Sequence, residues 1–270
     1  NCTLNAGTSN LIFTNGGAFS GGFKAYYNIS YTAGNNASIS GVTSANDISF
    51  TPAGTITGST STFNNVSFTN NGTINGSNTF NNLTFGSLST YTLAAGTTQT
   101  VNGTITCSSS CSGLSTFKSS TSSPAIISKA AGSVSFDYVK LSNITATGGA
   151  TYTANNAIAT GSNTGWTINL LVAKTLYWVG GTGNWNDGSH WSLTSGGSAI
   201  NCTATELDDV FFDANSFTAA SQTVTINSGA ASCNNMNWTG VLNTPTFVIS
   251  NVFADGLNVY GSLTYVSGMN

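Results

Sequence analysis

The residues of this 270-residue chain that could do chemistry gather between positions 187 and 213. Four of the eight acidic residues stand within eight positions, as Glu206, Asp208, Asp209 and Asp213. Because clustered carboxylates without basic neighbours suit hard cations, this group is a candidate Ca²⁺ site, although its spacing is not that of an EF-hand. The alternative is that Asp208 and Asp209 accept hydrogen bonds from backbone N–H groups at a turn before an apolar strand. No other cofactor is expected.

Groups suited to catalysis are scarce. His190 is the only histidine, and Asp187 is the only nearby carboxylate that could orient it as a general base. Between residues 48 and 136 there is no acid, and the only bases are Lys118 and Lys129. Polysaccharide lyases and hydrolases need clustered carboxylates, or Lys or Arg, along one face. We therefore expect no catalytic residue and no enzymatic activity, and a polysaccharide-degrading β-helix enzyme is the catalytic alternative.

Tryptophan is concentrated in one glycine-rich stretch. Four of the five Trp lie between 166 and 191, and Trp178, Trp185 and Trp191 belong to the run Y-W-V-G-G-T-G-N-W-N-D-G-S-H-W-S at 177–192. Such a cluster is either a platform on which sugar rings stack or a packed cap that closes one β core and begins the next.

The five cysteines allow two local pairings. Cys107 and Cys111 flank three serines and could close a tight turn, while Cys202 and Cys233 could bridge a longer excursion of the chain. Cys2 is left over. Disulfides would indicate an oxidising, extracellular setting, and the alternative is free, buried cysteines that act as small apolar residues. No C-x-x-C pair is present, so a zinc site is not expected.

The composition excludes several classes of protein. Charged residues make up 5% of the chain, against about 25% in ordinary domains, and there is no arginine. A net charge of −3 cannot neutralise many phosphates, so nucleic-acid binding is not expected. No stretch approaches the roughly 18 apolar residues of a membrane span. Hydrophobic types still supply 39%, which is enough for a core.

A short phrase recurs along the sequence. The segment 63–68 reads F-N-N-V-S-F and returns as F-N-N-L-T-F at 80–85 and C-N-N-M-N-W at 233–238, with looser copies at 26–31, 45–50 and 136–141. The central aliphatic residues of successive copies stand at positions 29, 48, 66 and 83, so the phrase returns at a nearly constant interval. A second phrase, S-I-S-G at 38–41, T-I-T-G at 55–58 and T-I-N-G at 73–76, keeps the same period.

Two strand phrases with one period predict an all-β fold. Each coil, of about 17–19 residues, contributes at least two short strands, whose inward apolar residues alternate with outward Ser, Thr or Asn. One coil cannot bury its apolar face alone, so stacked coils must share a core. We predict a parallel β-solenoid, or β-helix, in tandem modules. The crossover rule favours right-handed winding, although such coils also fit left-handed hexapeptide helices.

The texture of the sequence changes near residue 170. We expect a first solenoid module over 1–170, and over 171–270 the aromatic and glycine-rich cap motif followed by the start of a second solenoid. Both ends of the chain lie within strand-like sequence, so we interpret it as a stretch of a longer protein, and a mature protein is the alternative.

The motif that opens the second module resembles a known family. It reads W-x-G-x-x-x-x-W-x-x-x-x-x-W from Trp178 to Trp191, followed by D-D-V-x-F at 208–212. This is similar to the start of repeats in bacterial passenger and adhesin proteins. Together with the F-N-N coils, it resembles the very large repetitive surface adhesins of Bacteroidota, which include gliding-motility adhesins exported by the type IX secretion system. The secretion signal expected at a family C-terminus is not visible.

The resemblance implies a secreted, outer-membrane-attached protein of the cell surface, with secretion and surface machinery as partners and no catalytic residues to carry over. We therefore expect a structural and adhesive segment that forms a rigid rod. Its further partners would be neighbouring repeats or like subunits, and surface polysaccharides or solid surfaces. The alternatives are a filament-forming subunit, and a carbohydrate-binding or ice-binding solenoid. The ice-binding alternative depends on a partial T-x-T ladder at Ser38/Ser40, Thr55/Thr57, Thr73/Asn75 and Thr104/Thr106.

Overall fold

The computed structural model describes residues 8–58, 60–227, 231–250 and 256–267, and Cys2 lies outside these ranges. Here the chain consists of short β-strands, loops and one helical turn, η1 (Gly188–His190). Among these residues the paired strands are parallel, except that β18 (Thr175–Trp178) is antiparallel to β20 (Trp191–Ser192). Parallel strands stacked coil upon coil form a β-solenoid, which confirms the predicted fold class.

The chain divides into two compact units. The first comprises Asn1–Ser110 and Leu114–Leu171, and the second comprises Cys111–Gly113 and Val172–Asn270. The short segment Cys111–Gly113 thus belongs with the second unit although it interrupts the first in sequence.

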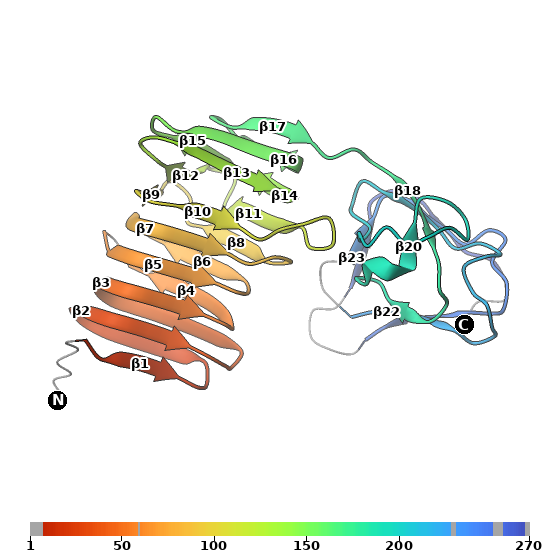
Figure 1. The fold of residues 1–270 in the computed structure, drawn as a ribbon, viewed down its shortest axis with the longest axis horizontal. Coiled ribbons are helices and arrows are strands. Elements are labelled where there is room, and N and C mark those ends of the chain that lie inside the picture. The colour runs from red at the N-terminus through yellow and green to blue at the C-terminus, as the bar shows by residue number, and fades with distance from the viewer. Residues whose placement is uncertain (1–7, 59, 228–230, 251–255, 268–270) are drawn as a thin grey trace. The chain divides into compact units, whose positions relative to one another are not determined.

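The first unit is a stack of short strands, which Figure 1 shows as successive layers from β1 to β17. They are β1 (Asn10–Phe13), β2 (Gly17–Tyr31), β3 (Asn36–Phe50), β4 (Ala53–Thr57), β5 (Thr62–Phe68), β6 (Gly72–Asn75), β7 (Asn78–Phe85), β8 (Thr90–Leu93), β9 (Thr98–Val101), β10 (Ile105–Cys107), β11 (Ser115–Ser119), β12 (Ala125–Ser128), β13 (Ser133–Asp137), β14 (Val139–Ser142), β15 (Ile144–Thr147), β16 (Thr151–Thr160) and β17 (Thr167–Leu170).

The repeated phrases lie in register. In β5 and β7, which belong to successive coils, Phe63 pairs with Phe80 and Val66 pairs with Leu83. The second phrase aligns in the same way across β3, β4 and β6. After β7 the coils lengthen, as the pairing of Leu83 with Ile105 indicates, because loops are inserted at the corners. The predicted period therefore holds in the early coils, is exceeded in the middle coils, and returns in the last coils of the unit, where Ala125 pairs with Ile144 and Ser133 pairs with Thr151.

Each early coil has three sides. Residues 78–80 of β7 pair with β9, whereas residues 83–85 pair with β10, so β7 turns a corner between two sides. We call the side built by 17–20, 36–40, β4, β6 and β8 the first side. The second side includes residues 78–80 of β7 and its partner β9. The third side is built by 28–31, 47–50, 65–68, 83–85 and β10.

A column of aromatic rings fills the interior of the first unit. Ring centroids are separated by 4.6 Å between Phe13 and Tyr31, 5.5 Å between Tyr31 and Phe50, 5.0 Å between Phe50 and Phe68, and 6.0 Å between Phe68 and Phe85. These five rings occupy the same inward position in successive coils, and all four pairs are stacked nearly parallel. Repetition of one residue type per coil thus builds one continuous core.

The second unit has fewer strands and longer coils. Besides β18, β20 and η1, its strands are β19 (Gly183–Asn184), β21 (Asp209–Phe211), β22 (Thr223–Ile226), β23 (Ala231–Cys233), β24 (Met236–Asn237), β25 (Thr246–Ile249), β26 (Leu257–Val259) and β27 (Leu263–Thr264). Val210 pairs with Met236, a wider spacing in sequence than that between Phe63 and Phe80 in the first unit.

Candidate functional site

A groove of about 550 Å³ crosses the first side of the first unit, over β2, β3, β4, β6 and β8. Its lining consists of hydroxyl, amide and small apolar groups, without a charged side chain. Strand register arranges the outward residues in two columns, Asn36, Ala53, Asn71 and Thr90 in one, and Ala18, Ser38, Thr55, Thr73 and Thr92 in the other. Because the columns run across the strands, the groove follows the stacking direction.

Between the two columns the floor of the groove is largely bare backbone. A Cβ atom at Gly54 would lie 2.3 Å from the Phe50 ring, and one at Gly72 would lie 2.9 Å from the rings of Phe68 and Tyr91. Only glycine permits the strand to approach the rings this closely. The aromatic column of the core therefore fixes the glycine floor.

The hydroxyl groups that border the groove are open to a ligand. In the described part of the chain, the side chains of Ser38, Thr55, Thr73 and Thr92 make no hydrogen bond. All four are half-buried, and each lies on a neighbouring strand. Strands in a sheet are about 4.8 Å apart, so the hydroxyls form a regular row of donors and acceptors.

Elsewhere in the same coils, side-chain amides bond to one another in two rows, which we call the asparagine ladders. In the first ladder each Nδ2 donates to the Oδ1 of the preceding coil at 2.8–3.2 Å, through Asn28 to Asn10, Asn46 to Asn28, Asn64 to Asn46 and Asn81 to Asn64. In the second, Asn65 donates to Asp47 at 2.6 Å and Asn82 donates to Asn65 at 2.8 Å. These amides satisfy each other and need no ligand.

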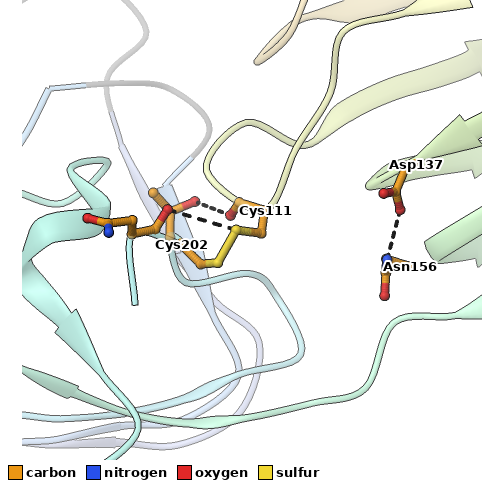
Figure 2. Close-up of a disulfide and its surroundings, with 6 residues drawn as sticks. Cys111, Asp137, Asn156 and Cys202 are labelled. Atoms are coloured by element: carbon orange, nitrogen blue, oxygen red, sulfur yellow. Dashed lines mark hydrogen bonds between the residues drawn. A yellow bond between two sulfur atoms is a disulfide. The ribbon is translucent and has the colours of Figure 1, made fainter. Parts of the chain in front are cut away.

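Aspartate accepts from a neighbouring asparagine at three such places. Besides Asp47, Asp137 accepts from Asn156 Nδ2 at 2.8 Å, as Figure 2 shows, and Asp209 accepts from Asn235 Nδ2 at 2.7 Å. The role of Asp209 as an acceptor for asparagine could have been predicted from the sequence. The segment L-D-D-V-F-F at 207–212 is a copy of the F-N-N phrase with both asparagines replaced, as its register with Met236 in C-N-N-M demonstrates.

Asp208 lies at a turn before β21. Its carboxylate is fully buried and accepts hydrogen bonds from Lys174 N at 2.7 Å, Thr205 N at 2.8 Å and Thr205 Oγ1 at 2.7 Å. Three donors can stabilise a carboxylate away from water, so this residue has a structural role.

The other acids of the candidate Ca²⁺ site have separate surroundings. Asp209 Oδ1 accepts from Asn234 Nδ2 at 2.9 Å and from Asn235 Nδ2 at 2.7 Å. Asp213 Oδ1 accepts from Asn215 N at 2.9 Å, and Glu206 is half-buried. Among the described residues no group of three His, Cys, Asp or Glu could hold a metal ion. The acids that are clustered in sequence therefore do not form a set of metal ligands in space.

The tryptophans of the glycine-rich run form the core of the second unit. Trp178, Trp185 and Trp191 are fully buried, and Trp191 meets the other two edge to face with centroids 5.1 and 4.9 Å apart. Phe212 lies against them and stacks on Trp238 at 3.7 Å. A ring without an exposed face cannot stack on a sugar, so packing is the role that the geometry supports.

His190 is held by the same core. Its ring stacks on Trp178 at 4.7 Å, and its Nδ1 lies 2.8 Å from Val179 O. Asp187 Oδ2 is 4.0 Å from Nε2, and Asp187 Oδ1 accepts from the N–H and hydroxyl of Ser189. These bonds from Ser189 lower the pKa of the carboxyl. Asp187 therefore caps η1, and its Oδ1 is occupied by the two donors of Ser189.

The cysteine pairing differs from the prediction. Cys111 is bonded to Cys202, and Thr203 N donates to Cys111 O at 3.0 Å beside the bridge (Figure 2). Cys107 and Cys233 are free. The predicted pairs Cys107–Cys111 and Cys202–Cys233 are therefore wrong.

Two features of the fold explain this correction. Cys111 lies in the segment that belongs with the second unit, whereas Cys107 ends β10 of the first. Cys233 takes the inward aromatic position of the F-N-N phrase and is fully buried, and burial raises its thiol pKa to about 12. Local spacing cannot reveal the first fact, whereas the second could have been predicted from the F-N-N phrase, in which Cys233 stands where Phe63 and Phe80 stand.

Comparisons with protein-family models, curated proteins and solved structures found no match. In the part of the chain that the structure describes, no helix has the length and hydrophobicity to cross a membrane.

Proposed function

We propose that this chain is a structural and adhesive repeat segment of a large secreted bacterial surface protein, and that it acts without catalysis. The observation that carries the proposal is the use of polar groups in the first unit. Its asparagine ladders and aromatic column tie each of the early coils to the next, while an uncharged row of hydroxyls remains open to the outside.

The first part of the proposal, a stiff support, follows from repetition. Parallel backbone hydrogen bonds join each coil to its neighbours, and in the early coils stacked rings and ladder amides add to them. Such a support presents many identical weak contacts to a polysaccharide or a solid surface, and multivalency raises the overall affinity.

The second part of the proposal is location. The Cys111–Cys202 disulfide suits an oxidising, extracellular setting. The resemblance of the W-x-G motif and F-N-N coils to Bacteroidota adhesins suggests attachment to the outer membrane after type IX secretion, with a part in gliding.

Adhesion can be tested with the purified chain displayed on beads, incubated with immobilised neutral and acidic polysaccharides and with glass and polystyrene. We expect retention on at least one neutral polysaccharide that increases with bead loading, and no release of reducing sugar ends. Beads that bind nothing would contradict the adhesive role, and released sugar ends would contradict the absence of catalysis. Ice binding is tested by thermal hysteresis, which we expect to be absent because the row of hydroxyls borders a hollow.

A further inference from the structure

We propose that the groove on the first side binds one segment of an uncharged, linear polysaccharide, laid across β2, β3, β4, β6 and β8. The inference rests on the proposed adhesive function and gives it a specific site. The groove of about 550 Å³ is large enough for an oligosaccharide of a few rings.

The first argument is the availability of polar groups. The hydroxyls of Ser38, Thr55, Thr73 and Thr92 make no hydrogen bond within the described residues. A ligand with its own hydroxyls can bond to them without breaking a bond in the protein. On the ladders, by contrast, Asn64 and Asn65 are each bonded to the coils before and after.

The second argument is charge. No lining residue is ionisable, so an ionic group placed in the groove would lose hydration without gaining a partner of opposite charge. The next outward residue in the hydroxyl column is Lys118, which pairs in register with Thr92 and stands beyond the groove. The interior therefore suits a neutral sugar.

The third argument is repetition. Five strands spaced about 4.8 Å apart give a groove roughly 19 Å long, with one hydroxyl or small group per strand in the column of Ser38, Thr55 and Thr73. A polymer that presents a similar hydroxyl at each unit can meet this row in several registers. We therefore expect weak binding that strengthens with ligand length until the groove is filled.

A second hollow, of about 240 Å³, lies against β1 and does not compete as a site for this ligand. It is lined partly by Asn10, Asn28 and Asp47. Asn28 donates to Asn10, and Asp47 accepts from ladder amides and brings a negative charge. Its polar groups are already engaged.

The test is calorimetric and NMR titration of the full chain with neutral β-linked oligosaccharides of two to eight sugars, and with matched uronic-acid oligomers. Thr73→Trp should fill the groove and abolish binding. Ser67→Trp, at an outward position of the third side, is the matched control and should bind like wild type. Thr73→Val removes one hydroxyl at constant shape and should weaken binding roughly three- to tenfold.

Thermal melts verify that each variant folds, and Thr73→Val remains informative if Thr73→Trp does not. Wild-type affinity from Thr73→Val, or preference for the acidic oligomers, would overturn the proposal. If neutral oligomers fail to bind while the beads still adhere, the groove proposal fails and adhesion stands. If the beads also bind nothing, both fail. Self-association of the chain blocked by Thr73→Trp would assign the groove to a second copy and likewise overturn it.

Discussion

The groove and the asparagine ladders are made of the same kinds of residue in the same coils, and they use them in opposite ways. An asparagine amide carries a donor and an acceptor on one planar group long enough to reach its neighbour across about 4.8 Å, so identical amides form a chain. Hydroxyls can also bond between coils, as Ser49 Oγ donates to Ser30 Oγ at 2.9 Å, but those of Thr55 and Thr73 remain unbonded among the described residues. On the ladders, the polar side chains bond to one another, whereas in the groove the hydroxyls remain available to a ligand.

The strongest test of the comparison removes what the two surfaces share. Phe68 is 1% exposed and stacks between Phe50 and Phe85, below both the groove floor and the third side. We expect Phe68→Ala to lower the free energy of unfolding of the first unit by about 3–5 kcal/mol. Guanidinium unfolding followed by circular dichroism measures the loss. Tryptophan fluorescence is the internal control, because four of the five Trp lie in the second unit. A loss of less than about 1 kcal/mol would contradict the shared core.

A second test separates the surfaces. Asn65 both donates to Asp47 and accepts from Asn82, so Asn65→Ala leaves two ladder groups without partners. We expect a loss of about 1–3 kcal/mol. Thr73→Ala, which breaks no hydrogen bond, should change stability by less than about 0.5 kcal/mol. Equal losses in the same denaturation assay would mean that the ladders are not the more tightly bonded surface.

A separate effect is expected at alkaline pH. Burial raises the pKa of Tyr31 and of Tyr91 to about 12, and Tyr31 Oη donates to Ser38 O in the groove strand β3. Since the folded state holds these protons more tightly than the unfolded state, the stability they contribute should be constant below about pH 10 and fall between about pH 10 and 12. Tyr31→Phe should reduce this slope. An unchanged slope in the double variant Tyr31→Phe/Tyr91→Phe would assign the pH dependence to other groups.

The smallest effect should come from Asp47→Asn. The new amide can still accept from Asn65 through Oδ1, but it loses the charge and the bond from Asn46. We expect a loss of about 0.5–1 kcal/mol, less than that of Asn65→Ala. If Asp47→Asn lowered the free energy of unfolding more than Asn65→Ala in parallel melts, the charge of Asp47, and not the row of amides, would be the main stabilising feature of the second ladder.

Repetition made the fold predictable from the sequence. The F-N-N and T-I-T-G phrases recur at one period because each coil meets the same neighbours, and the structure pairs Phe63 with Phe80 as they require. The hollow between the outward columns was not predictable, because it depends on how closely Phe50 approaches Gly54 across the core. The disulfide was missed for a similar reason, since Cys111 and Cys202 have a sequence separation of 91.

The acidic cluster illustrates that composition alone does not predict how neighbouring acids are used. Four neighbouring acids suggest a shared ligand, yet Asp208 accepts hydrogen bonds at a turn and Asp209 accepts from the amide of Asn235 on the next coil. Aligning L-D-D-V-F-F with the repeat would have assigned Asp209 correctly. In a repeat protein, the position within the phrase is more informative than the number of charges nearby.

The stacking direction also has a mechanical consequence. Hydrogen bonds between coils run along the stack, so a pull in that direction loads the interfaces one after another instead of all at once. A coil that unfolds, such as the one from Ser44 to its partner Thr62, occupied about 4.8 Å of the stack and becomes roughly 60 Å of extended chain. Under tension, the first unit would therefore lengthen in discrete steps, one coil at a time.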